Sequence, residues 1–131
     1  MIGVKDKNKV LYPELSYRIV GISFEVFNKL GYGLREKNYY KALEEVFSRE
    51  GLKFKKQVSA DLKFDGKKIG KYFLDYIIED KVVLEIKVGN HYDKENIKQI
   101  YDYLKSTDLQ LGILINFTSK GIKSKRILNI S

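Results

Sequence analysis

Two short apolar runs separated by a charged break constrain the fold of this chain more than any other feature. Residues 72 to 78 and 81 to 88 are rich in β-branched and aromatic side chains, and Glu79-Asp80 lies between them. Such residues favour β-strands, and so short a polar break favours a tight turn. We therefore expect the two runs to pair as an antiparallel hairpin.

This hairpin carries three charged residues among apolar neighbours. Alternation along the second strand puts Glu85 and Lys87 on one face, and a connection made by residues 79 to 81 sets Asp75 opposite Glu85. Two carboxylates and an ammonium in a half-buried sheet are costly unless an ion compensates them. The arrangement suits a divalent metal that keeps water ligands for a phosphate substrate. Lys87 would then hold the attacking water or stabilise charge on the phosphate.

A simpler interpretation of the same residues stays open. Glu85 and Lys87 could be the solvent face of an amphipathic strand, with Asp75 as a hairpin charge that pairs with Lys87. Glutamate and lysine two positions apart are common, so the spacing alone does not decide between a site and a surface.

Apolar residues at helical spacing lie on both sides of the hairpin. They predict helices over residues 14 to 30, 34 to 50 and about 93 to 106, with Asp93 as a candidate N-cap of the third.

Three further segments complete the expected topology. Residues 52 to 69 alternate apolar with polar around Asp65-Gly66, which predicts a strand or a hairpin. Residues 111 to 117 read as a buried strand, which a right-handed crossover would place parallel to the strand that carries Glu85. The expected order is α-α-β-β-β-α-β, followed by a basic tail with Lys120, Lys123, Lys125 and Arg126.

Length and composition favour one domain. A chain of 131 residues with 44% hydrophobic residues can bury one core. Residues 1 to 13 look like an N-terminal arm, and 14 to 131 form the expected domain. No apolar run reaches the roughly 18 to 20 residues of a membrane span, and the N-terminus is too charged for a signal peptide, so we expect a cytoplasmic protein without membrane contact.

Charge and cysteine content narrow the chemistry. The formal charge of +8 favours an anionic partner, of which nucleic acid is the leading candidate. The chain has no cysteine, which excludes disulfides and thiolate zinc sites and leaves oxygen ligands for hard cations.

The segment FLDYIIEDKVVLEIKV resembles the core motif of the PD-(D/E)XK phosphodiesterase superfamily. Asp75 matches the first acid of that motif, and Glu85 and Lys87 match its ExK. The resemblance implies a restriction-endonuclease-like fold, an α/β mixed sheet flanked by helices.

Flanking motifs resemble one branch of that superfamily, named after its GxxExxY signature. Gly33, Glu36 and Tyr39 match that signature, and Gln99, Tyr103 and Leu104 match the QxxxYL of its later helix. A strand like residues 112 to 117 follows in that branch. The resemblance covers roughly residues 15 to 128.

The resemblance also implies residue roles. Asp75 and Glu85 would bind magnesium, for which manganese would substitute, and Glu36 would help organise the metal or its waters. Lys87 would be the catalytic lysine, and Gln99 and Tyr103 would border the substrate groove. Physical alternatives remain, because Glu36 also suits the first turn of a helix as a dipole partner. Gln99 and Tyr103 also suit the polar border of a packed helix.

Two functions follow from this interpretation. The first is a metal-dependent nuclease that hydrolyses DNA phosphodiester bonds, as an endonuclease or an exonuclease, by metal-activated water. The second is a non-catalytic nucleic-acid-binding or regulatory module with the same fold. A homodimer is a further alternative, because many junction-cleaving members of the superfamily act as dimers.

Overall fold

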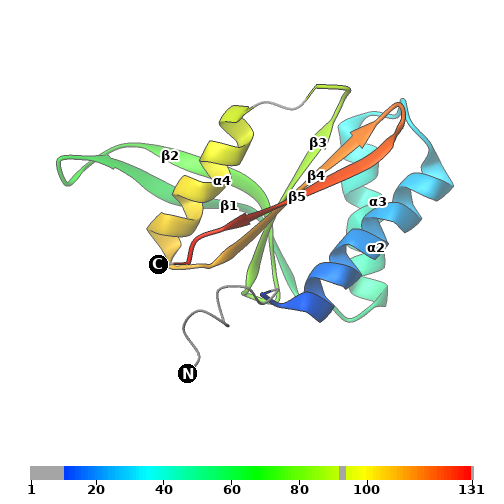
Figure 1. Cartoon of the computed structure of the whole chain (residues 1–131), viewed down its shortest axis with the longest axis horizontal. Coiled ribbons are helices and arrows are strands. Elements are labelled where there is room, and N and C mark those ends of the chain that lie inside the picture. Colours follow the sequence, from blue (N-terminus) through cyan, green and yellow to red (C-terminus); the bar gives the residue numbers. More distant parts are fainter. Residues whose placement is uncertain (1–10, 92–93, 131) are drawn as a thin grey trace.

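The computed structural model describes residues 11–91 and 94–130 (Figure 1). Most of the expected N-terminal arm and the expected N-cap Asp93 therefore lie outside the described residues. The helices are α2 (Pro13–Leu30), α3 (Glu36–Arg49) and α4 (Lys94–Thr107). The strands are β1 (Phe54–Phe64), β2 (Lys67–Ile78), β3 (Val82–Val88), β4 (Leu111–Thr118) and β5 (Gly121–Leu128).

The three predicted helices are present and differ from the expected ranges by one or two residues. Proline suits the first turn of a helix, since its missing N–H has no partner there, and α2 accordingly begins at Pro13, the last residue assigned to the arm. The same helix ends at Gly31, whose φ of 73° favours glycine and whose N–H donates to the Phe27 carbonyl.

The five strands form one mixed sheet in the order β1-β2-β3-β4-β5. Neighbouring strands are antiparallel except β3 and β4, which are parallel and are joined through α4. The predicted hairpin of β2 with β3 and the predicted parallel pairing of residues 111 to 117 are both confirmed. In this register Glu85 is paired with Leu114, and Lys87 with Asn116.

Helices cover both faces of the sheet (Figure 1). On one face, α2 and α3 pack over the alternate residues of β3 and β4 that include Leu84, Ile86, Ile113 and Ile115. On the other face, α4 packs over a smaller core of Leu74, Val83, Ile100, Tyr103, Leu104, Leu114 and Ile127. None of the helices in the described part of the chain combines the length and apolar character needed to cross a membrane.

The prediction of a basic tail was wrong. Residues Gly121–Leu128 form β5, an edge strand paired antiparallel with β4, with Leu114 opposite Lys125 and Asn116 opposite Lys123. Few of its residues are apolar, and its strand conformation depends on backbone hydrogen bonds to β4, which a pattern of side chains does not reveal.

Asp65 and Gly66 form the turn of a long hairpin of β1 with β2. Their φ angles of 51° and 78° are the positive values that a two-residue hairpin turn of this type requires. This confirms the hairpin alternative for residues 52 to 69. The prediction of separate strands was wrong in one respect, because β2 runs without a break from Lys67 to Ile78 and joins the end of the segment 52 to 69 to the strand 72 to 78.

Candidate active site

At Asp75 the alternation of side chains along β2 is interrupted, so that the residues before and after it point to opposite faces of the sheet. Leu74 packs in the core beneath α4, whereas Tyr76 packs in the core of α2 and α3. In β1, Gln57 has a φ of 51° between two regular pairs, Lys56 with Tyr76 and Val58 with Leu74. The irregular backbone at Gln57 lies opposite Asp75. Such irregularities twist a strand pair and re-aim side chains.

Hydrogen bonds from backbone N–H groups to the carboxyl groups of Asp75 and Glu85 replace part of the backbone hydrogen-bond ladder between β2 and β3. Regular pairing ends at Tyr76 with Leu84, and one further step in the same register brings Asp75 opposite Glu85. There the Asp75 N–H donates to Glu85 Oε1 at 3.0 Å, and the Ile86 N–H donates to Asp75 Oδ2 at 2.7 Å. These bonds fix both carboxyl groups at the point where the two strands separate.

Burial makes this carboxyl pair reluctant to ionise. Desolvation raises the pKa of Asp75, against hydrogen bonds that lower it, and the charge of Glu36 adds to the rise. Desolvation, followed by the charge of Asp75 and a side-chain hydrogen bond with it, raises the pKa of Glu85 to about 8. Burial and the proximity of the two charges thus favour a proton on this pair when nothing else compensates the charge.

Tyr40 connects this pair to Glu36. Its hydroxyl lies 2.7 Å from Glu36 Oε1 and 3.3 Å from Asp75 Oδ2, and donates toward both. Burial, followed by the charge of Asp75, raises the pKa of the Tyr40 hydroxyl far above its usual range. A neutral phenol therefore separates two carboxylates and reduces their repulsion.

The donor set of Asp75 and Glu85 fits a divalent cation. The pair is half-buried, its oxygens are hard ligands, and no lysine or arginine forms an ion pair with it among the residues that the structure describes. A cation would replace a proton on this pair and remove the cost of two buried charges. Within the same residues, no group of three or more histidine, cysteine, aspartate or glutamate side chains gathers into a metal site. The Tyr40 hydroxyl lies between Glu36 and Asp75.

Lys87 lies on the same face of β3 as Glu85, two residues further along. It is partly buried and makes no hydrogen bond or ion pair within the described part of the chain. On β4 its register partner is Asn116, which is only 3% exposed. The pairing of Asp75 with Lys87, which the simpler interpretation of these residues requires, is therefore absent among the described residues, and the ammonium is free for a ligand.

Gln99 and Tyr103 lie on α4 in positions that hold the helix to the sheet. Gln99 Nε2 donates to the Phe73 carbonyl of β2 at 2.8 Å, close in sequence to Asp75. Tyr103 is 2% exposed and belongs to the core beneath α4. The contacts of both side chains are thus with the protein, and a contact of either with substrate stays a prediction.

Gly33, Glu36 and Tyr39 lie in the turn between α2 and α3 and in the first turns of α3. Gly33 has a φ of 108°, a conformation that favours glycine, in the turn between α2 and α3. Tyr39 is fully buried against Phe117, and its hydroxyl donates to the Gly31 carbonyl at 2.6 Å. This turn is thereby tied to the sheet, and Glu36 in the first turn of α3 is held near Tyr40 and Asp75.

Two residues of this region were missed by sequence reasoning. Tyr40 is four residues after Glu36 on one face of a helix, a spacing that could have suggested their contact. Asn116 carries a side-chain amide in the otherwise apolar interior of β4. Strand alternation places it on the same face of the sheet as Gly112 and Leu114. A polar residue within so apolar a run was the available signal.

Two solved structures resemble this chain. The chain is similar to the crystal structure of SSO0001, with a TM-score of 0.56 and 24% identity over 72% of this chain and 50% of that one. It is also similar to an alkaline exonuclease, LHK-Exo, from Laribacter hongkongensis, with a TM-score of 0.52 and 14% identity over 93% of this chain and 72% of that one. The chain thus spans half the length of SSO0001.

These structural similarities show the fold, a mixed sheet flanked by helices as in restriction endonucleases. No curated protein matches the chain. The model of the PD-(D/E)XK nuclease superfamily matches residues 13–127, which is nearly the whole described structure. The chain belongs to the PD-(D/E)XK nuclease superfamily.

Proposed function

We propose that this chain is a metal-dependent nuclease domain that hydrolyses DNA phosphodiester bonds. The observation that carries the proposal is the half-buried pair of Asp75 and Glu85, which two backbone N–H groups hold side by side and with which no lysine or arginine forms an ion pair among the described residues. Membership of a nuclease superfamily, whose members generally use divalent metal ions, supports the same conclusion. We propose magnesium as the ion, with manganese as a substitute, because both take oxygen ligands.

Asp75 and Glu85 are the proposed ligands, each through a carboxyl group that a backbone N–H already orients. When bound, the cation would supply an activated water and offset the charge of the phosphate. Lys87, on the face of Glu85, would orient that water and stabilise the extra charge on the phosphate oxygens as the new P–O bond forms. Glu36 acts on Asp75 through the Tyr40 hydroxyl, and we keep its metal role as a prediction.

Placement within the GxxExxY branch is part of the proposal. Its support is the local structure of that signature, in which Gly33 makes the turn, Tyr39 anchors it and Glu36 faces Tyr40. In this arrangement Gly33 and Tyr39 shape the turn before α3, and Glu36 is linked to Asp75 through the Tyr40 hydroxyl.

A cleavage panel tests the activity. Purified protein should cut at least one of supercoiled, linear, single-stranded or branched DNA in Mg²⁺ or Mn²⁺, and not in EDTA. Glu85→Ala and Lys87→Ala should each abolish cleavage and leave the circular dichroism spectrum unchanged. Glu45→Ala on the exposed side of α3 and Lys81→Ala before β3 remove the same charges elsewhere and should cleave normally. Cleavage that survives Glu85→Ala and Lys87→Ala would exclude these residues as the centre.

A non-catalytic nucleic-acid-binding module is the second candidate. It is favoured by the finding that no three metal-ligating side chains converge within the described residues. It predicts DNA affinity that falls steeply with salt, no turnover with any metal, and little change in affinity for Glu85→Ala. The cleavage panel and a binding titration on the same substrates therefore separate the two functions.

A further inference from the structure

Asn116 is a buried amide without a protein partner. The residue is 3% exposed in the middle of β4, and neither its Oδ1 nor its Nδ2 makes a hydrogen bond within the described structure. Buried side-chain amides are nearly always hydrogen-bonded, because losing water without replacement is unfavourable. An amide with both ends unpaired therefore needs an explanation, such as a ligand that supplies the missing partner.

The register of the sheet places this amide in a row of cationic side chains. Lys87 of β3, Asn116 of β4 and Lys123 of β5 are successive partners across three adjacent strands. Adjacent strands are about 4.8 Å apart, so the backbones of the two lysines are about 10 Å apart with the amide between them. Two residues away along each strand, a second row of register partners is formed by Glu85, Leu114 and Lys125.

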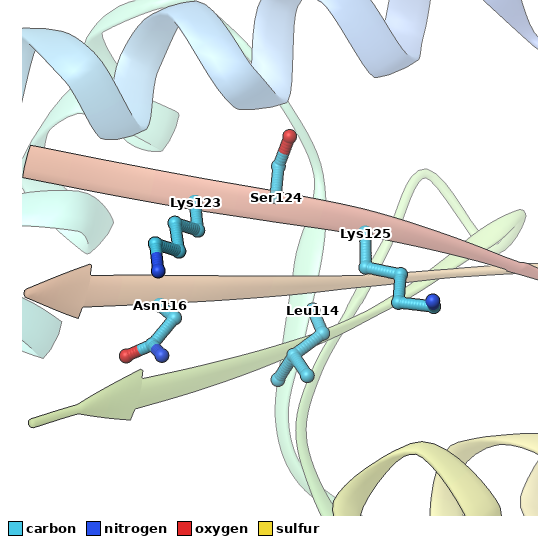
Figure 2. Close-up of a pocket in the computed structure, with 5 residues that line it drawn as sticks. All are labelled: Leu114, Asn116, Lys123, Ser124 and Lys125. Carbon is cyan, nitrogen blue, oxygen red and sulfur yellow. The ribbon is translucent and has the colours of Figure 1, made fainter. Parts of the chain in front are cut away.

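A cavity of about 440 Å³ opens over this part of the sheet. Figure 2 shows Lys123 directed from β5 toward Asn116, while Ser124 points to the other side of the strand. The lining residues are Leu114, Asn116, Lys123, Ser124 and Lys125. The described residues that line the space supply two ammonium groups and one amide N–H donor without any carboxylate, so the cavity suits an anion with several acceptor oxygens.

We propose that Asn116 and Lys123 form a subsite for a backbone phosphate of the nucleic acid, next to the phosphate that Lys87 contacts. The inference rests on the proposed function of Asp75, Glu85 and Lys87. Asn116 Nδ2 donates to a phosphate oxygen, and Lys123 supplies charge from the edge strand. Lys125 extends the cationic surface along β5. The subsite fixes the path of the strand across β4 and β5 and holds the scissile bond over the carboxyl pair.

The unpaired amide makes the test specific. Asn116→Leu removes both unsatisfied polar atoms and keeps a similar side-chain volume, so the free protein should require more urea to unfold. DNA binding should instead weaken by roughly 10-fold, which is the range expected for the loss of one hydrogen bond to a charged group. Asn116→Asp keeps the shape and adds a negative charge, so it should weaken binding further. Lys123→Ala should lower the slope of log affinity against log salt by about 1, and Lys81→Ala should leave binding to the site unchanged.

Affinity is measured by fluorescence anisotropy with labelled single-stranded and double-stranded DNA oligonucleotides in Ca²⁺ and again in EDTA, using the full chain. Unchanged affinity in Asn116→Leu, or a loss of stability in that variant, would overturn the subsite, as would failure of the full chain to bind either oligonucleotide. The nuclease proposal fails separately. If binding depends on Asn116 but nothing is cleaved, the subsite stands; if DNA is cut and Asn116→Leu binds normally, the subsite alone fails.

Discussion

The Asp75 N–H donates to Glu85 Oε1, and one residue beyond Glu85 the Ile86 N–H donates to Asp75 Oδ2. Each acid thus accepts a backbone hydrogen bond from the opposite strand. Among the described residues, no lysine or arginine helps to hold the carboxyl groups, which leaves their charge to be compensated by a proton or a cation. Positioning by the backbone also makes the distance between the acids insensitive to side-chain motion elsewhere.

The first prediction concerns stability without metal. The pKa of Glu85 in the folded chain, about 8, is above its ordinary value of 4.5, so the folded state keeps this proton to higher pH than the unfolded state. The associated stability is complete below pH 4.5 and is lost as the pH rises toward 8. Glu85→Gln mimics the protonated form and should raise the free energy of unfolding at pH 8 by about 1 to 3 kcal/mol.

Urea unfolding of Glu85→Gln and of the natural chain in EDTA at pH 4.5 and pH 8 measures this difference. The gain in the free energy of unfolding of Glu85→Gln should largely disappear at pH 4.5. Glu25→Gln provides a control of opposite sign, because Lys29 and Arg49 hold the pKa of Glu25 below its usual range. That variant should lose stability at pH 8. A Glu85→Gln variant that is less stable than the natural chain at pH 8 would contradict the assigned pKa shift.

The second prediction concerns proton release on metal binding. Since Mn²⁺ needs ionised carboxylates and the pKa values of Asp75 and Glu85 are raised, its binding should displace a proton from this pair, and its affinity should rise between pH 6 and pH 8. Calorimetric titrations in two buffers of different ionisation enthalpy give the number of protons released, which should be between zero and one and should fall as the pH rises. Binding that releases no proton at pH 6 would argue against this pair as the ligands.

Much of the site could be predicted from the sequence because its parts are local. The hairpin of β2 and β3 has a short connection, so the positions of Asp75, Glu85 and Lys87 follow from strand alternation and a count of turn residues. The buried strand β4 and its parallel pairing follow from an apolar run after a helix.

The remaining features depend on contacts between distant segments. Gly121–Leu128 becomes a strand only through β4, and Asn116 acquires its place beside Lys87 only through the parallel register. The contact of Tyr40 with Asp75 joins residues 35 positions apart, which depends on how α3 packs on the sheet. No pattern within one segment encodes these relationships.

The third prediction concerns Tyr40. Tyr40→Phe removes the hydroxyl that lies between Glu36 and Asp75, so the two carboxylates should repel each other more strongly. The pH at which Mn²⁺ binding is half complete should move upward, and cleavage near neutral pH should fall by about 10-fold or less, in the range of one hydrogen bond to a charged group. Tyr17→Phe removes a hydroxyl from a side chain that is 82% exposed and should change neither quantity. Identical pH profiles for Tyr40→Phe and the natural chain would remove Tyr40 from the site.

The last prediction concerns the docking of α4. A Cβ added at Gly112 would lie 2.4 Å from Ile100 Cγ2, so β4 and α4 approach closely because this glycine has no side chain. Gly112→Ala should force α4 away from the sheet and lower the free energy of unfolding by about 1 to 3 kcal/mol, as overpacking does in other cores. Gly21→Ala in the middle of α2 meets nothing within 4 Å and should instead stabilise the helix by about 0.5 to 1 kcal/mol.

Thermal unfolding of the two alanine variants should therefore shift in opposite directions. Gln99 of α4 is hydrogen-bonded to Phe73 of β2, so displacement of the helix in Gly112→Ala should also strain the strand that carries Asp75. Mn²⁺ affinity should consequently fall in this variant and stay unchanged in Gly21→Ala. Loss of stability with normal metal affinity would show that α4 supports the fold but does not position the acids, and the helix would then have no part in setting the geometry of the carboxyl pair.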